Sequence, residues 1–246
     1  MKIYDKISEQ SRAGRKQFSL LIDPDKYSTE QLLSCIAIAN RAGVDYIFVG
    51  GSLLTENTMR SCVSFIKGHT ELPVILFPGS TLQYCEEADA MFFLSLISGR
   101  NPDLLIGRHV EIAPLLKNTT VEIIPTGYML VDGGRPTTAS YISNTFPIPA
   151  DKPDIAACTA MAGELLGLKL IYMDCGSGAQ KPLSPEMIRT VKKNIDIPLI
   201  AGGGIRTHEQ VAMACRAGAD IIVVGNVIEE DPELLLRFGE AIQNLA

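Results

Sequence analysis

The sequence predicts a (β/α)8 barrel, also called a TIM barrel, that forms a single domain over residues 1–246. Eight short, almost continuously apolar runs recur along the chain, segments of helical period separate them, and the length of 246 residues suits a barrel, which typically needs about 250. Unbroken apolar runs are typical of parallel strands that are buried on both faces. Because this rhythm does not demonstrate closure, an open doubly wound sheet remains the alternative.

The expected strands are short and rich in apolar side chains. They are residues 18–23, 45–50, 73–78, 90–96, 121–126, 169–174, 198–202 and 220–225. The helices between them have recognisable ends: Ser28 or Thr29 caps the first, Gly43 ends it, and Ser184 caps a later one just before a proline. The third unit, residues 80–89, is too short for a full helix, so we expect an irregular element there.

Composition narrows the class of protein. Hydrophobic residues make up 46% of the chain and charged residues 20%, which allows a large core. The net charge of −6 and the lack of a basic cluster argue against a nucleic-acid partner. No apolar run approaches the roughly 20 residues of a transmembrane helix, and the N-terminal stretch lacks the apolar region of a secretory signal. The six cysteines contain no CxxC pair, so we expect reduced, mostly buried thiols in a cytoplasmic protein.

Glycine-rich turns follow the last three expected strands. The sequence CGSG follows the sixth strand, GGGI the seventh, and VVGN ends the eighth. In a barrel the functional site lies at the carboxyl ends of the strands. Glycine lets a phosphate approach the backbone closely and supplies turns with positive φ. We therefore expect a phosphate site held by backbone N–H groups, since these turns contain no lysine; the alternative is that the glycines only form tight turns.

Two aspartates follow the first strand, in the segment LLIDPDK. Carboxylates are poor partners for a bare phosphate but good ligands for Mg²⁺, which completes its shell with water and phosphate oxygens. Asp23 ends the strand and is the expected metal ligand, and Ser52 at the neighbouring strand end offers a further oxygen. Asp25 is expected to be solvated or to support the site from behind. The alternative is that Asp23 only caps the turn before Pro24 and that Lys26 neutralises Asp25.

Asp174 and Tyr172 are the expected catalytic side chains. Asp174 ends the sixth strand beside the expected phosphate site, where it can hold a hydroxyl group or accept its proton. Tyr172 lies two residues earlier and therefore points to the same inner face. Its phenol can bind a phosphate or a hydroxyl group; the alternative is a tyrosine that only packs in the barrel. We expect the histidines to be structural, because they fall in or at the ends of helical segments: His69, His109 and His208.

Seven segments together resemble the geranylgeranylglyceryl phosphate synthase family, the PcrB-like prenyltransferases. They are LLIDPDK, VGGS, LISGRNPDLLIGRHV, PTGYMLVDGG, YMDCGSGA, LIAGGGIRT and VVGNVIEED. The similarity covers nearly the whole chain, and the forms SGRNP and GSGA resemble the second of the family's two groups. This resemblance implies an Mg²⁺-dependent transfer of a long prenyl group, geranylgeranyl or similar, from its diphosphate to the C3 hydroxyl of sn-glycerol 1-phosphate. The product would be an ether-lipid precursor.

The resemblance also assigns residues. It implies that Asp23 and Ser52 are the magnesium positions. The glycerol phosphate positions that it implies are Tyr172, Met173, Asp174, Cys175, Gly176, Ser177, Gly178, Gly203, Gly204, Gly225 and Asn226. It further implies a cytoplasmic homo-oligomer that contacts a membrane surface transiently, through its lipid product.

Two positions depart from the family pattern. Many members carry glutamate where this chain has Asp174, whose side chain is one methylene shorter. One subgroup carries a lysine where this chain has Leu21, so any phosphate-binding role must pass to another cation such as Lys26 or Arg100. Aliphatic residues near the second to fifth strands, together with the long segment 130–153, are expected to form a groove for the prenyl tail.

Two other functions remain open at this point. A phosphosugar isomerase or aldolase-like barrel would share the phosphate site, but it needs an acid–base pair or a Schiff-base lysine at a strand end, and no lysine is so placed within a strand. A non-catalytic phosphometabolite-binding barrel would bind glycerol phosphate and ignore both Mg²⁺ and prenyl diphosphate.

Overall fold

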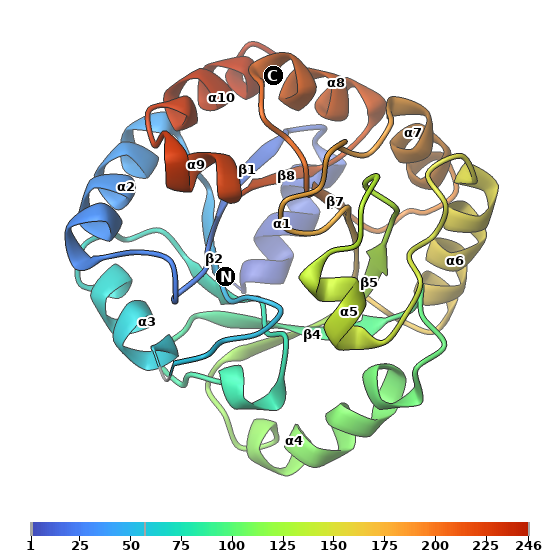
Figure 1. The fold of residues 1–246 in the computed structure, drawn as a ribbon, viewed down its shortest axis with the longest axis horizontal. Helices are drawn as coiled ribbons and strands as arrows, with labels where there is room; N and C mark the ends of the chain where they lie inside the picture. Colours follow the sequence, from blue (N-terminus) through green and yellow to red (C-terminus); the bar gives the residue numbers. More distant parts are fainter. Residues whose placement is uncertain (1, 57, 246) are drawn as a thin grey trace.

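Eight parallel strands close into a barrel in the computed structural model, which describes residues 2–56 and 58–245 (Figure 1). The strands are β1 (Gln17–Ile22), β2 (Tyr46–Val49), β3 (Val74–Leu76), β4 (Ala90–Leu96), β5 (Glu122–Leu130), β6 (Leu170–Asp174), β7 (Leu199–Gly202) and β8 (Ile221–Val224). Every expected strand is present. The open-sheet alternative is wrong, because β8 pairs with β1 and closes the barrel.

Helices cover the outside of the barrel. The outer helices are α2 (Thr29–Ala42), α3 (Met59–Lys67), α4 (Arg108–Leu116), α6 (Pro153–Leu165), α7 (Pro185–Lys193), α8 (His208–Ala217) and α10 (Leu234–Gln243). Two short helices, α5 (Thr138–Ser143) and α9 (Asn226–Glu230), lie inside this ring at the mouth of the barrel (Figure 1). Their ends follow from the sequence. The Ser28 side chain accepts a hydrogen bond from the Gln31 N–H and caps α2, and Gly43 ends α2 with a left-handed backbone. Ser184 caps α7 in the same way.

The third helical position is irregular, as the sequence predicts. A single 3-10 turn, η1 (Thr81–Gln83), takes the place of a helix between β3 and β4. A π-helical turn, η2 (Asp103–Gly107), then leads from β4 into α4. Because η1 is so short, no helix of its own covers the exit of β3, by which we mean the carboxyl end of the strand and the loop that follows it. Helix α4 lies at the edge of the apolar groove described below.

The alternation of strands and helices does not predict α1 (Ile3–Arg12), which lies inside the ring of helices in Figure 1. Its Ile7 belongs to the cluster that fills the barrel interior. The Glu122 carboxylate, at the start of β5, accepts hydrogen bonds from the N–H groups of Ile3 and Tyr4. Helix α1 therefore closes the amino end of the barrel and leaves the carboxyl ends of the strands open.

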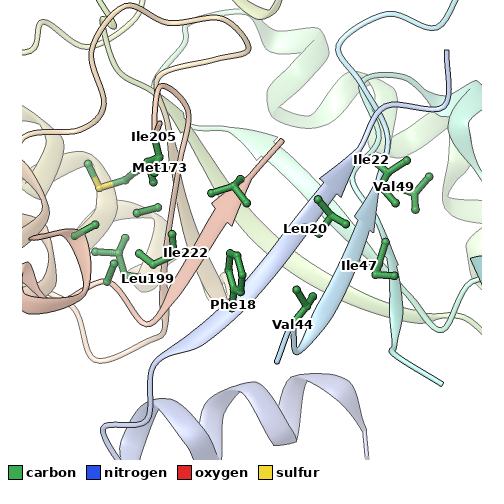
Figure 2. Packing of buried hydrophobic residues seen from close by; sticks show 14 of the residues in the cluster. Phe18, Leu20, Ile22, Val44, Ile47, Val49, Met173, Leu199, Ile205 and Ile222 are labelled. Atoms are coloured by element: carbon green, nitrogen blue, oxygen red, sulfur yellow. The ribbon is translucent and has the colours of Figure 1, made fainter. Parts of the chain in front are cut away.

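The hydrophobic core has two layers. Side chains such as Phe18, Leu20 and Ile47 point outward from the strands towards the helices (Figure 2). Others, such as Phe48 and Phe92, fill the barrel interior and contact each other edge to face, with ring centroids 4.8 Å apart. Burying one side chain of this size contributes about 1.5–3 kcal/mol. This packing holds the strand ends, and hence the loops of the site, in fixed positions.

Gly239 lets α10 lie directly against α2. A Cβ atom at this position would overlap the carbonyl oxygen of Ala42, which is a backbone atom and cannot swing away. We expect Gly239→Ala to lower the free energy of unfolding by about 1–3 kcal/mol, although alanine has the better helix propensity. Gly68→Ala is the matched control, because Gly68 has a φ of −76° and a Cβ there would meet atoms no closer than 3.5 Å. Urea denaturation checks this; equal stability of the two variants would contradict the close packing.

The described residues bear on two further expectations. Within residues 2–56 and 58–245, none of the helices has the length and apolar character that crossing a bilayer requires. All six cysteines are unpaired, and all except Cys158 are buried. The prediction of reduced, mostly buried thiols is therefore confirmed.

Candidate active site

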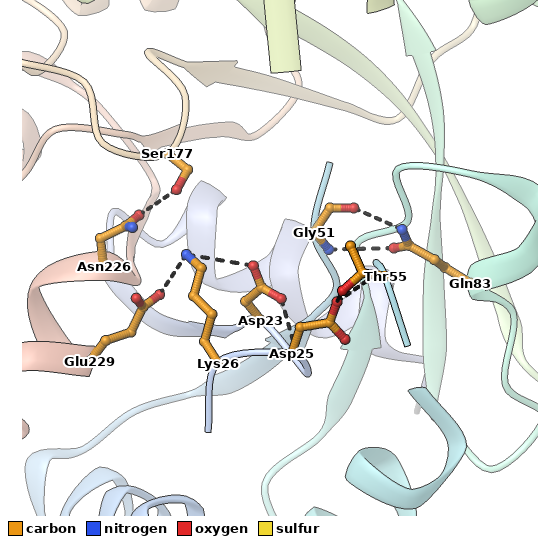
Figure 3. Close-up of polar contacts among 9 residues, drawn as sticks. All are labelled: Asp23, Asp25, Lys26, Gly51, Thr55, Gln83, Ser177, Asn226 and Glu229. Atoms are coloured by element: carbon orange, nitrogen blue, oxygen red, sulfur yellow. Dashed lines mark hydrogen bonds and ion pairs between the residues drawn. The ribbon is translucent and has the colours of Figure 1, made fainter. Parts of the chain in front are cut away.

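Asp23 lies at the mouth of the barrel, just after β1. Its carboxylate faces Gly51, where a Cβ atom would come within 3.2 Å of Oδ2. The Lys26 ammonium lies 3.5 Å from Asp23 Oδ2 and 3.1 Å from Glu229 Oε1, so it joins the exits of β1 and β8 (Figure 3). Lys26 therefore pairs with Asp23 rather than with Asp25, so that part of the alternative interpretation is wrong. The other part is confirmed, because Asp23 Oδ1 accepts a hydrogen bond from the Asp25 N–H at 3.2 Å and so caps the turn at Pro24.

Asp25 belongs to the loop framework. Its carboxylate accepts hydrogen bonds from the Thr55 N–H at 2.6 Å, the Thr55 hydroxyl at 3.0 Å and the Thr58 hydroxyl at 2.8 Å. Desolvation opposes the charged form, but the hydrogen bonds from Thr55 and Thr58 outweigh it and lower the pKa of Asp25. Asp25 thus fastens the loop after β1 to the loop after β2, and its oxygens are already engaged.

Gln83 holds the loop that carries Ser52. The buried Gln83 amide donates to the Gly51 carbonyl at 2.8 Å (Figure 3). Its Oε1 atom accepts from the Gly79 N–H at 3.1 Å. These bonds tie the exits of β2 and β3 together and fix the position of Ser52. Sequence reasoning missed Gln83; the available signal is an amide side chain in the one unit whose helix is reduced to a turn.

The exits of β6, β7 and β8 meet on the other side of the mouth. Gly203 and Gly204 have φ angles of 80° and 72°. A Cβ atom on Gly203 would come within 2.5 Å of Asp174 Oδ1. Gly225 has a φ of −141°, so the expectation of positive φ is wrong at this one turn. Ser177 on the β6 exit donates to Asn226 on the β8 exit at 2.8 Å, which joins the two loops.

These turns leave backbone donors free. Within the part of the chain that the structure describes, the backbone N–H groups of two pairs of consecutive residues donate no hydrogen bond to another protein atom. They belong to Ser177, Gly178, Gly203 and Gly204. Backbone N–H groups grouped around turns of positive φ form concave anion-binding sites. This arrangement can hold a phosphate without a lysine, as the sequence predicts.

Asp174 is buried at the end of β6, with 8% of its surface exposed. Its Oδ1 atom accepts from the Gly176 N–H at 2.6 Å, and its Oδ2 atom accepts from the Tyr128 hydroxyl at 2.7 Å. Burial raises the pKa of Asp174, and the hydrogen bonds from Tyr128 and Gly176 offset only part of that rise. Tyr172 lies on the same inner face, as predicted. Phe77 stacks on its ring, with the two ring centroids 4.9 Å apart.

Two pockets open at this end of the barrel. The first, which we call the polar cleft, has a volume of about 580 Å³ and contains Asp23, Lys26, Asp174 and the glycine turns. The second, the apolar groove, runs from the β3 exit to α4 and α5. Its lining is mostly apolar and includes Pro78, Met91, Phe93, Leu94, Leu96, Leu104, Ile112, Leu130 and Ile142. The two pockets share a rim of four residues: Gly51, Ser52, Phe77 and Tyr128.

The segment 130–153 joins the two pockets. It carries α5 and is pinned to the barrel where Val131 bridges to Ile148. Arg135 lies in the polar cleft, and Ile142 lies in the apolar groove. The predicted groove near the second to fifth strands is therefore present, and this segment forms one of its walls.

Cations reach the polar cleft from three loops. Lys26, Arg135 and Arg206 all line it. Arg206 donates to the Ala179 carbonyl at 3.1 Å, and a Cβ atom on Gly178 would overlap the Arg135 guanidinium. Arg100 donates to the Gly99 carbonyl instead, so of the two substitutes considered for Leu21 only Lys26 lies at the site. Sequence reasoning missed Arg135, because loop residues have no periodicity that places them.

Comparison with known proteins identifies the family. Residues 11–242 match the PcrB family. The chain belongs to the PcrB family. The geranylgeranylglyceryl phosphate synthase of Chitinophaga pinensis is 51% identical over 245 residues, which cover 100% of this chain and 97% of that protein. The synthase of Pyrococcus abyssi is 44% identical, over 91% of this chain and 88% of its own length.

The fold of this chain agrees closely with a solved structure. That structure is of (S)-3-O-geranylgeranylglyceryl phosphate synthase from Thermoplasma acidophilum in complex with its substrate sn-glycerol-1-phosphate. It superposes with a TM-score of 0.93 at 34% sequence identity and covers 99% of both chains. The predicted fold and the predicted family are both confirmed.

Proposed function

We propose that this PcrB family member transfers a long prenyl group from its diphosphate to the C3 hydroxyl of sn-glycerol 1-phosphate. The observation that carries the proposal is the meeting of a polar cleft, lined by free backbone amides, with an apolar groove at a shared rim. Joining a phosphorylated alcohol to a long hydrocarbon requires such a junction. The relative from Thermoplasma acidophilum binds sn-glycerol-1-phosphate, which supports this choice of acceptor.

The acceptor is proposed to bind at the exits of β6, β7 and β8. Its phosphate takes hydrogen bonds from the free amides of Ser177, Gly178, Gly203 and Gly204. The glycerol then extends towards Asp174, whose Oδ1 atom lies beside Gly203. In this pose the C3 hydroxyl reaches the rim that the two pockets share, and the buried carboxylate of Asp174 is the group on which the released proton finally resides.

The donor diphosphate is proposed to bind at the exits of β1 and β2, with Mg²⁺ held by Asp23 and Ser52. Within the described residues, no group of three or more His, Cys, Asp or Glu side chains is arranged to hold a metal. One carboxylate and one hydroxyl group fit Mg²⁺, because this ion keeps several waters and takes phosphate oxygens as ligands. When bound, it would stabilise the negative charge of the departing diphosphate. Lys26 lies next to Asp23 and supplies a second positive charge.

The reaction makes one bond and breaks one. The C3 oxygen of glycerol phosphate bonds to C1 of the prenyl group, the bond from C1 to the diphosphate oxygen breaks, and diphosphate leaves. The hydroxyl proton passes to the Asp174 side of the cleft. The apolar groove holds the hydrocarbon tail and keeps water away from the reacting carbon, which becomes positively charged as the diphosphate departs.

A product assay tests the proposal. Purified protein is incubated with sn-glycerol 1-phosphate, Mg²⁺ and radiolabelled prenyl diphosphates of several chain lengths. We expect an organic-extractable phosphate product that is absent when Mg²⁺ is chelated. Absence of product at every chain length, with glycerol phosphate binding still measurable by calorimetry, would instead favour the non-catalytic binding protein.

Arg135 is proposed to close over the acceptor phosphate. Its guanidinium lies against Gly178, whose amide is one of the free donors, and charge-assisted hydrogen bonds to phosphate are typically worth about 1.5–3 kcal/mol. We expect Arg135→Gln to raise the KM for glycerol phosphate by about 10-fold, with kcat little changed. Steady-state kinetics check this. Arg189→Gln, on the outer helix α7, is the control, and an equal KM in both variants would contradict the role of Arg135.

Location and assembly are also proposals. Six unpaired cysteines support a reducing compartment such as the cytoplasm. A homo-oligomer would cover the exposed apolar side chains on and near α5 and α6, including Tyr141, Phe146 and Ile155. A transient contact with a membrane surface would allow the lipid product to leave the groove.

A further inference from the structure

Tyr128 occupies the point where the two pockets meet. The shared rim consists of Gly51, Ser52, Phe77 and Tyr128, and of these four residues only Tyr128 carries a phenol. That hydroxyl donates to Asp174 Oδ2 at 2.7 Å. The phenol therefore connects the site of bond formation to the buried carboxylate.

The ring of Tyr128 is held in one position by two other aromatic rings. Phe77 and Tyr172 each contact it edge to face, with ring centroids 5.6 Å away. Phe77 and Tyr172 also stack on each other, so the three rings form one packed group at the rim. Burial raises the pKa of Tyr128 well above its ordinary value, and the Asp174 charge adds to this rise. The phenol is therefore neutral at physiological pH and keeps its proton on the hydrogen bond to Asp174.

Both oxygens of Asp174 are already engaged. Oδ1 accepts from the Gly176 N–H at 2.6 Å and Oδ2 accepts from Tyr128. The carboxylate therefore lies between the Tyr128 hydroxyl group and the turn after β6, and only 8% of the residue is exposed. The Tyr128 oxygen, by contrast, retains acceptor capacity after donating its own proton, and Tyr128 lines both pockets.

We propose that Tyr128 is a catalytic residue that relays the proton from the acceptor hydroxyl to Asp174, an inference that rests on the proposed function. As the C3 oxygen bonds to the prenyl C1 and the bond from C1 to diphosphate breaks, the C3 hydroxyl proton moves to the Tyr128 oxygen. The Tyr128 proton moves along its hydrogen bond to Asp174 Oδ2. The phenol ends neutral, Asp174 ends protonated, and diphosphate carries away the electron pair of the broken bond.

Tyr128→Phe tests the relay, because it keeps the ring and removes only the hydroxyl group. We expect kcat to fall by about 100-fold, the lower range for loss of a proton-transfer group, while the Kd of glycerol phosphate measured by calorimetry without prenyl diphosphate changes less than about 3-fold. Tyr84→Phe is the matched control: it removes a phenol that bonds Thr119 away from both pockets, and kcat should be unchanged.

A double variant separates a relay from simple packing. If Tyr128 and Asp174 act as one unit, Tyr128→Phe combined with Asp174→Asn should be no slower than the slower single variant, within about 3-fold. Losses that multiply would mean independent roles and would overturn the proposal. A kcat for Tyr128→Phe within 3-fold of the wild-type value would also overturn the proposal. The same holds if the affinity of Tyr128→Phe for glycerol phosphate fell by as large a factor as its kcat. Absence of product from the wild-type protein would refute the proposed function itself. If the wild-type protein makes product but Tyr128→Phe keeps its kcat, only the relay is refuted.

Discussion

Asp23→Asn is expected to lower kcat/KM for prenyl diphosphate by about 1,000-fold, or about 4 kcal/mol of transition-state stabilisation. The amide keeps the size of the side chain but removes the carboxylate that faces Gly51, next to Ser52 in the chain. Calorimetry should show that Mg²⁺ no longer strengthens binding of prenyl diphosphate, whereas the affinity for glycerol phosphate stays within about 3-fold of wild type. That selectivity follows because the acceptor phosphate is assigned to the opposite side of the cleft.

Asp25→Asn is the matched control for this prediction. It also removes one negative charge from the same loop, but the Asp25 oxygens are engaged by Thr55 and Thr58. We expect some loss of stability, with the dependence on Mg²⁺ retained. If Asp25→Asn abolished the metal dependence and Asp23→Asn did not, the assignment of the two aspartates would have to be exchanged.

Asp174→Asn is expected to lower kcat by about 1,000-fold and, at the same time, to stabilise the protein at pH 7. Burial raises the pKa of Asp174 above its ordinary value of 3.8. The folded state therefore binds this proton more tightly than the unfolded chain, and stability falls as the pH rises from the unfolded pKa through the raised folded pKa. At a pH above this raised pKa the wild-type protein carries an ionised carboxylate in a desolvated position. An asparagine avoids that cost and can still accept from Gly176 and donate to the Tyr128 oxygen.

Thermal unfolding between pH 4 and pH 8 checks the stability part of this prediction. The Tm of Asp174→Asn should exceed that of wild type at pH 7, and the difference should shrink as the pH is lowered towards 4. Asp220→Asn is a useful comparison, because Asp220 is also buried but pairs with Lys192 at 2.7 Å. Loss of that pairing should destabilise the protein at pH 7. A lower Tm for Asp174→Asn at all pH values would show that its carboxylate is a net structural support.

The barrel and one side of the site could be predicted from the sequence, because each signal was local. Buried parallel strands need unbroken apolar runs, and helix caps need particular residues such as Ser28 and Gly43. Asp23 and Gly203 were found because chemical type and position at a strand end coincide. These signals do not depend on knowing which loops come together in space.

The remaining parts depend on contacts between distant segments. The sequence predicts that the fifth strand ends at residue 126, whereas β5 continues to Leu130 and carries Tyr128 to the rim. Gln83 is important because it hydrogen-bonds to Gly51 after β2 and to Gly79 after β3, which the sequence does not show to be close together. Arg135 lies on a loop that only the fold brings to Gly178. Helix α1 was missed because its few apolar residues pack into the barrel end rather than along a helical face in the outer ring.

We propose that the two substrates bind at separate ends of one cleft and meet at the rim that the polar cleft and the apolar groove share. A crystal structure of the protein with Mg²⁺, sn-glycerol 1-phosphate and an unreactive prenyl thiolodiphosphate tests it most directly. We predict the glycerol phosphate at Gly203 and Gly204, the metal and diphosphate at Asp23, and the hydrocarbon tail in the apolar groove, with the C3 hydroxyl within hydrogen-bond distance of Tyr128. Glycerol phosphate bound at Asp23, or a tail lying outside the groove, would show that the two substrates occupy other positions than those proposed.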